Sequence, residues 1–162
     1  MRLLLAAAAA FTLMAAPAFA WSYSERESDI DLWISAFQDD ATGHQLALSC
    51  SDWAPEDADI TVYSPEDYEE TSSYAPEVPL TVTVDGLETG PLKGKFANYD
   101  GKLSVTVYET DDTRVRPLFE LIQKAKTGIE VSYFDKKLTF PVSNVERSVG
   151  SFLANCDGVA LF

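Results

Sequence analysis

The sequence contains a single histidine, His44, within the run Thr42-Gly43-His44. A serine–histidine–aspartate triad would also need a serine on a strained strand-to-helix turn. The G-x-S-x-G pattern that marks such a turn does not occur. Because Thr42-Gly43 is typical of a hairpin turn, we expect the His44 side chain to be solvated. The sequence therefore predicts no catalytic residue on this basis.

Carboxylates are the second group that could do chemistry, since the 162 residues include 26 Asp and Glu against 12 Lys and Arg. Two carboxylates can hydrolyse a glycosidic bond without a histidine, so a small carboxylate-dependent glycan hydrolase stays open as an alternative function. The acids are too many for one pair to be singled out. Our first interpretation is a protein that is not an enzyme.

Asp57-Ala58-Asp59 could belong to a Ca²⁺ site, because hard cations take oxygen ligands. The sequence lacks an EF-hand loop and a Gly-Asp repeat. A Ca²⁺-stabilised structural module is therefore a third interpretation, and we predict no metal site and no cofactor. With one His and two Cys, zinc modules built on Cys and His clusters are excluded.

The formal net charge of −14 argues against binding to nucleic acid and to anionic lipid headgroups, both of which attract Lys and Arg. No Lys or Arg occurs between Glu27 and Leu92, a stretch with 16 acidic residues. This half could be a solvated acidic face, or a docking surface on which aromatic rings anchor a basic protein or peptide and carboxylates steer it. The predicted partner-binding residues are Trp53, Asp57, Asp59, Tyr63, Glu66, Asp67, Tyr68, Glu69, Glu70 and Tyr74.

The first 20 residues have the three parts of a secretory signal peptide. Arg2 is followed by an apolar run and then by Ala18-Phe19-Ala20, which is a small-x-small cleavage site. We expect cleavage after Ala20, export to the periplasm or the medium, and a single domain over residues 21–162. Cys50 and Cys156 are the only cysteines, and an oxidising compartment favours a disulfide between them.

Alternation of apolar and polar residues dominates the rest of the chain and predicts short strands with one buried face. Asp100-Gly101 is a type I′ hairpin signal, and Asp135-Lys136-Lys137 is expected to form another turn. Ser64–Val78 is expected to be a long loop. The expected strands lie near residues 30–34, 45–50, 60–63, 80–84, 93–99, 103–109, 129–133 and 138–142.

Two amphipathic helices are expected at Thr113–Thr127 and Asn144–Asn155, from apolar residues that recur at helical spacing. The second ends at Cys156, so the disulfide would fasten it to the strand that carries Cys50. The predicted fold is mainly β: an antiparallel β-sandwich or partly open barrel of seven to eight strands with two short peripheral helices.

The C-terminal third follows a definite order: a helix over Pro117–Gly128, a strand over Ile129–Tyr133, a further strand at Leu138–Phe140, and a short helix over Ser148–Cys156. This order resembles small exported proteins of the invasion-associated locus B family. The resemblance covers residues 114–156. It implies a compact β-sandwich of the bacterial envelope with a role in interaction rather than catalysis, and it carries over no functional residue.

Overall fold

A computed structural model describes residues 20–159 except 28, 30, 54–56 and 70–76. The signal-peptide prediction therefore falls almost wholly outside the described residues, as do Ile30, Glu70 and Tyr74. The elements are β1 (Ser22–Glu27), β2 (Leu32–Asp39), β3 (Gln45–Ser51), β4 (Asp59–Asp67), β5 (Val78–Val84), β6 (Leu87–Tyr99), β7 (Lys102–Tyr108), α1 (Val115–Gln123), β8 (Ile129–Tyr133), β9 (Lys136–Phe140) and α2 (Val145–Val159).

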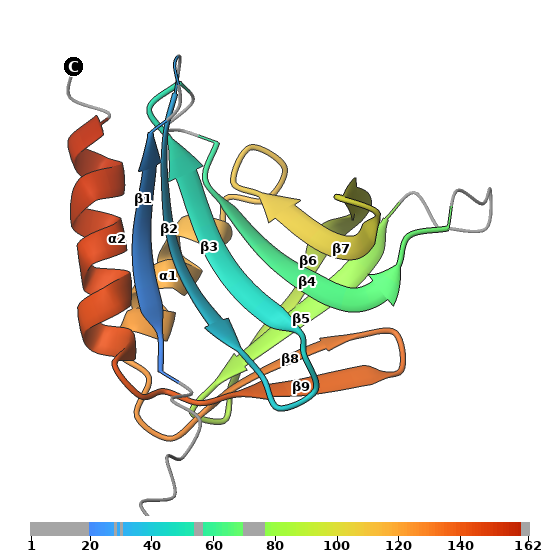
Figure 1. Cartoon of the computed structure of the whole chain (residues 1–162). Coiled ribbons are helices and arrows are strands. Elements are labelled where there is room, and N and C mark those ends of the chain that lie inside the picture. Colours follow the sequence, from blue (N-terminus) through green and yellow to red (C-terminus); the bar gives the residue numbers. More distant parts are fainter. Residues whose placement is uncertain (1–19, 28, 30, 54–56, 70–76, 160–162) are drawn as a thin grey trace, which may run out of the picture.

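The fold is mainly β, as predicted, and takes the form of one open antiparallel sheet with two short helices. The sheet has nine strands in the order β1-β2-β3-β4-β7-β6-β5-β8-β9. It curves from β1–β3 at the front of Figure 1 through β4 and β7 to β8 and β9. Eight strands were predicted from the sequence, and β1 is the additional one. Its sequence SYSERE lacks the apolar alternation on which the strand prediction depended.

The curvature is concentrated in β6, which belongs to both halves of the sheet. Its first part, as far as Gly94, pairs with β5, and its second part, from Lys95, pairs with β7. At this junction a Cβ on Gly94 would lie 2.7 Å from the carbonyl oxygen of Val78. Glycine is therefore required where the two halves of the sheet meet.

The helices cover the inner face of the sheet. α2 packs on β1, β2 and β3, and α1 packs on α2. Cys50 of β3 is bonded to Cys156 of α2, with their Cα atoms 6.1 Å apart, so the predicted disulfide is confirmed. Phe119 of α1 and Phe152 of α2 meet edge to face at the centre of the core.

Several boundaries differ from prediction. α1 ends at Gln123 rather than Thr127, and the expected loop Ser64–Val78 starts late because β4 continues to Asp67. The Asp100-Gly101 turn is confirmed, since both residues have positive φ. The β8–β9 turn is formed by Phe134 and Asp135, whereas Lys136 and Lys137 lie in β9.

Candidate functional site

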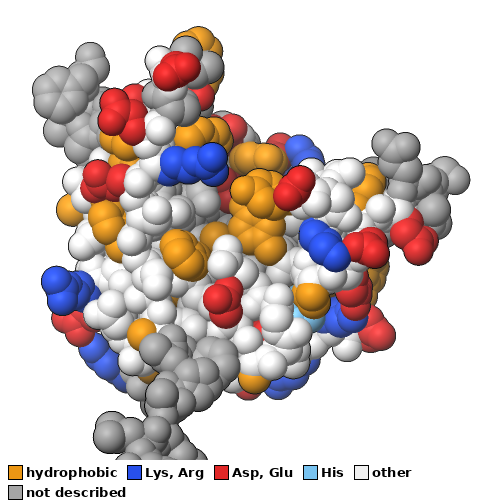
Figure 2. Space-filling model, in the orientation of Figure 1, with side chains coloured by type: hydrophobic (Ala, Val, Ile, Leu, Met, Phe, Trp, Pro, Cys, Tyr) orange, Lys and Arg blue, Asp and Glu red, His pale blue; other side chains and the backbone are white. Residues whose placement is uncertain are grey.

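The sheet has an outer face that neither helix covers. Side chains alternate along a strand, and Cys50 points inward to α2. Ala47 and Ser49 of the same strand therefore point outward. Figure 2 views the molecule from this side, where hydrophobic and acidic side chains are scattered over a surface of backbone and uncharged polar side chains (both white). The outward side chains of this face include small ones, such as Ala47 and Ser49, and large exposed ones, such as Trp33.

The strand register places the outward side chains in lines across the sheet. One line contains Ser35, Ser49, Asp59 and Tyr108. The next contains Phe37, Ala47, Thr61, Thr106 and Lys95. Asp59 of β4 therefore lies among hydroxyl and aromatic side chains contributed by three neighbouring strands.

Asp59 has a perturbed carboxyl group. Burial raises its pKa from 3.8 to about 7, against a hydrogen bond from the Thr61 hydroxyl at 2.7 Å, and the nearby charge of Asp57 raises it further. Within the described part of the chain no Lys, Arg or His forms an ion pair with Asp59. Its ionised form would therefore be stabilised by any cation that reaches it.

Tyr63 and Tyr108 lie close enough to this carboxylate for its charge to influence their pKa values, and Tyr99 packs on Tyr63. The rings of Tyr63 and Tyr99 are 4.7 Å apart at 57°, and burial together with the neighbouring Asp59, Tyr99 and Tyr108 raises the pKa of Tyr63. Thr61 and Thr106, whose hydroxyls are 2.9 Å apart, are only 3% and 6% exposed although they face outward. Neighbouring outward side chains therefore cover Thr61 and Thr106 and shield them from solvent.

Trp33, on the outer face of β2, and Trp53, in the bend after β3, are two exposed tryptophans at the end of the β2–β3 pair where β4 begins. Trp33 is 48% exposed and Trp53 is 82% exposed. Trp33 lies opposite Ser51, and the Asp52 N–H donates to the Leu32 carbonyl, so Trp53 follows directly after this pairing. Tryptophan and tyrosine are among the residue types that are enriched at the centres of protein-binding surfaces. We call Trp33, Trp53, Asp57, Asp59, Tyr63 and Tyr108 the acidic aromatic face.

The predicted partner-binding residues do not form one uniform surface. Trp53, Asp57, Asp59 and Tyr63 belong to the acidic aromatic face. Glu66 and Asp67 lie at the far end of β4, where Lys136 and Lys102 neutralise them. Tyr68 and Glu69 follow β4, and the Tyr68 N–H donates to the Gly101 carbonyl.

Sequence reasoning missed Trp33 and Tyr108, which come from β2 and β7. The apolar alternation in those strands could have indicated which face they share with Asp59, but not the strand order. It also missed the two lysines that neutralise Glu66 and Asp67, because Lys102 and Lys136 come from the basic half of the chain.

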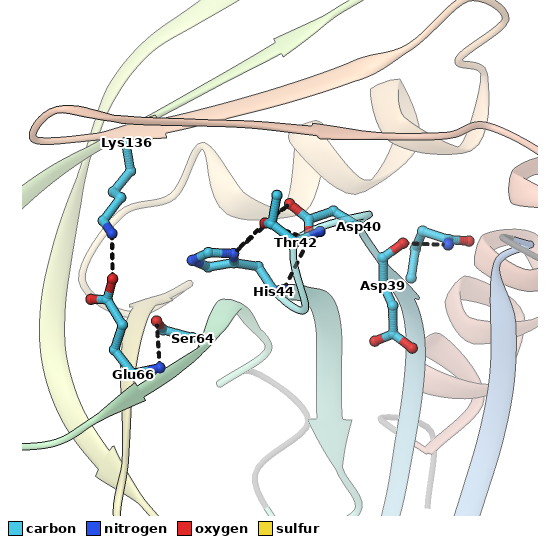
Figure 3. Close-up of polar contacts among 8 residues, drawn as sticks. Asp39, Asp40, Thr42, His44, Ser64, Glu66 and Lys136 are labelled. Atoms are coloured by element: carbon cyan, nitrogen blue, oxygen red, sulfur yellow. Dashed lines mark hydrogen bonds and ion pairs between the residues drawn. The ribbon is translucent and has the colours of Figure 1, made fainter.

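The expectation that His44 is solvated was wrong. The residue is 6% exposed and lies in a hydrogen-bond network within the β2–β3 hairpin (Figure 3). Asp40 accepts hydrogen bonds from the Thr42 N–H at 2.7 Å, the Thr42 hydroxyl at 2.8 Å and the His44 N–H at 2.9 Å. The Thr42 hydroxyl also lies 2.8 Å from Nδ1 of His44. The short polar turn is folded inward by these bonds, which the sequence pattern did not reveal.

An open groove of about 690 Å³ lies between the end of α1 and the start of α2, lined in part by Gln123, Lys126, Asn144, Glu146 and Arg147. Its one acid, Glu146, is paired with Lys126 at 3.1 Å, so the groove offers no carboxylate pair for glycoside hydrolysis. Among the described residues no three His, Cys, Asp or Glu side chains are grouped so that they could hold a metal ion.

Comparisons with protein-family models, with curated proteins and with solved structures found no match to this chain. In the part of the chain that the structure describes, no helix is both long and apolar enough to cross a membrane.

Proposed function

We propose that this chain is an exported, non-enzymatic protein that binds a basic protein or peptide through the acidic aromatic face. The observation that carries the proposal is Asp59. Its carboxyl group is half-buried on the outer face, carries a pKa raised to about 7, and has a hydroxyl as its hydrogen-bond partner instead of a cation. A Lys or Arg side chain of a partner would supply the missing positive charge.

The aromatic residues support the same partner chemistry. The faces of Tyr and Trp rings attract ammonium and guanidinium groups, most strongly when the contact excludes water. Tyr108 lies opposite Asp59, Tyr63 lies four residues further along the same face of β4, and Trp33 and Trp53 offer exposed rings near the start of β4. A basic segment crossing this face would therefore meet both carboxylates and aromatic rings.

Ion pairs at the far end of β4 exclude Glu66 and Asp67 from the proposed binding site. At the far end of β4 the Asp67 carboxylate is 2.6 Å from Lys102, and Glu66 is paired with Lys136. These carboxylates already have their counter-charge, so they would gain less from an incoming cation. The proposal therefore assigns recognition to the Asp57–Asp59 end of the strand.

Export is part of the proposal. It is supported by the signal-peptide pattern of residues 1–20 and by the disulfide between Cys50 and Cys156. The resemblance to the invasion-associated locus B family remains an expectation that agrees with an envelope protein.

The test uses a peptide of alternating Lys and Gly as the probe and the matching Glu-Gly peptide as its negative control. Binding is followed by tryptophan fluorescence at low and high salt, since the attraction is screened by salt. We expect Asp59→Asn to weaken binding of the Lys-Gly peptide by about tenfold, equivalent to about 1.4 kcal/mol. Asp67→Asn changes the net charge by the same amount and should leave binding nearly unchanged. Equal affinity of the two variants would overturn the assignment of the site.

A further inference from the structure

His44 has a ring nitrogen without a hydrogen-bond partner. The Thr42 hydroxyl has one proton, and the two carboxylate oxygens of Asp40 both lie 2.8 Å from it. Thr42 therefore donates to Asp40 and accepts from Nδ1–H of His44. This fixes the tautomer of the neutral ring, whose Nε2 is left as a bare acceptor. Nε2 is buried and has no partner.

Nε2 points toward an ion pair that joins two distant strands. In Figure 3 the imidazole of His44 extends from the β2–β3 turn toward Lys136 of β9 and Glu66 of β4. Tyr133 of β8 belongs to the same group: its hydroxyl is hydrogen-bonded to Ser64, and Glu66, Lys136 and Asp40 are all close enough to influence its pKa, which burial raises.

The Lys136–Glu66 ion pair connects β9 and β4, two strands that are not neighbours in the sheet. β9 is the last strand of the sheet and pairs only with β8, so no backbone ladder joins it to β4. At the other end of β9 the chain is fastened to the start of β1, where the Trp21 N–H donates to the Ser143 carbonyl at 2.9 Å. The ion pair and the Tyr133–Ser64 hydrogen bond are therefore two described polar contacts that hold this end of the β8–β9 hairpin against β4.

We infer that His44 is a proton-operated switch for this contact. When Nε2 takes up a proton from solvent, it becomes a donor that needs an acceptor, because a buried N–H without a partner is costly. The nearest ionised acceptor in the direction in which the ring extends in Figure 3 is the carboxylate of Glu66. As Glu66 turns to His44, Lys136 keeps its proton and moves into solvent, and the β8–β9 hairpin loses one of its two described polar ties to β4.

The charged and titratable groups around the ring are consistent with this exchange. Asp40, 3.9 Å from Nδ1 in its own hairpin, stabilises the imidazolium in place, and the phenol of Tyr133 stays neutral. Lys136 opposes a second positive charge next to Glu66, which favours its release to solvent. Asp135, in the β8–β9 turn, lies close enough to Lys136 to attract it there.

The experiment measures hydrogen exchange of backbone amides 136–140 from about pH 7.5 to about pH 5, corrected for the intrinsic pH dependence, with the β5 amides as an internal reference. The same samples give the titration of the imidazole resonances, which are unambiguous because the chain has one histidine. We expect protection of β9 to fall about tenfold relative to β5, with the midpoint of the His44 titration.

Two variants separate this switch from other acid effects. His44→Gln should abolish the pH dependence of β9 protection, whereas Asp59→Asn, which removes a carboxyl with a pKa of about 7, should leave that dependence in place. Lys136→Met should lower β9 protection already at about pH 7.5 and remove its further change with pH. The inference is overturned if His44→Gln and the unmodified protein lose β9 protection equally. It is also overturned if the unmodified protein titrates at His44 without any change in β9.

Discussion

Asp59 of β4 lies directly opposite Tyr108 of β7, on the face of the sheet that the helices leave uncovered. Opposed positions in an antiparallel pair bring Cβ atoms to within about 5.5 Å of one another. The carboxylate is thus held against an aromatic side chain instead of a counter-charge. Burial raises the pKa of Asp59, and no ion pair among the described residues gives this carboxylate a counter-charge.

Neutralising Asp59 should stabilise the protein above neutral pH. Its folded pKa of about 7 exceeds the ordinary value of 3.8, so the ionised carboxylate disfavours folding increasingly from about pH 4 to about pH 7. Asp59→Asn should therefore be about 1–3 kcal/mol more stable than the unmodified protein near pH 8, and equally stable near pH 4. Urea unfolding across this range measures the difference. A variant less stable than the parent at pH 8 would contradict the account.

Asp85 should show the opposite pH dependence. Its carboxylate accepts hydrogen bonds from the backbone N–H groups of Lys126, Thr127 and Gly128 and from the Thr127 hydroxyl, which lower its pKa to about 2. The stability that this carboxylate provides is present above about pH 4 and is lost as the pH falls toward 2.

Asp85→Asn is a clean test, because Asn tolerates the positive φ of this turn position. The variant should lower the melting temperature at pH 7 and have little effect near pH 2. An equal loss at both pH values would indicate a packing defect rather than loss of the charged acceptor.

The fold could be predicted in outline because its strands alternate in hydrophobicity and its turns have glycine where positive φ is needed. The disulfide could be predicted because the sequence has two cysteines and a predicted signal peptide. β1 could not be predicted in this way, since Ser22–Glu27 is polar and finds its place only by pairing with β2. The burial of His44 likewise depends on Asp40 and Thr42 closing the turn with side-chain hydrogen bonds.

The sequence indicated that acidic and aromatic residues form the candidate site, but not which of them lie together in the folded protein. Long-range pairing decides which carboxylates have a counter-charge: Lys102 and Lys136 lie 35 and 70 residues from their partners Asp67 and Glu66. Pairing also decides which aromatic residues surround Asp59. A sequence pattern within one strand contains neither kind of information.

The disulfide should contribute strongly to stability, because it links residues 106 positions apart. In the chain-entropy model, a closed loop of this length stabilises the folded state by about 4–5 kcal/mol. The double variant Cys50→Ala, Cys156→Ala should unfold at a correspondingly lower urea concentration, and reductant should affect only the parent protein. Equal urea midpoints for the oxidised protein and the double variant would show that the link contributes little.

Gly94 should not tolerate a side chain. The added methyl of Gly94→Ala would meet the Val78 carbonyl oxygen at 2.7 Å and Cγ1 of Val105 at 3.0 Å, so the β5–β6 pairing must shift. We expect a loss of about 1–3 kcal/mol in the free energy of unfolding. Gly128→Ala is the matched control, since nothing lies within 4 Å of its Cβ position, and it should change stability by less than about 0.5 kcal/mol.

The titration of the Asp59 carboxyl group, followed by carbon NMR with and without saturating Lys-Gly peptide, tests the proposed function most directly. If a cation of the partner pairs with Asp59, binding is linked to loss of its proton. The pKa should then fall from about 7 in the free protein by at least about one unit in the complex. A peptide that binds while the pKa of Asp59 stays at its free value would contradict the proposal that this carboxylate recognises the basic partner.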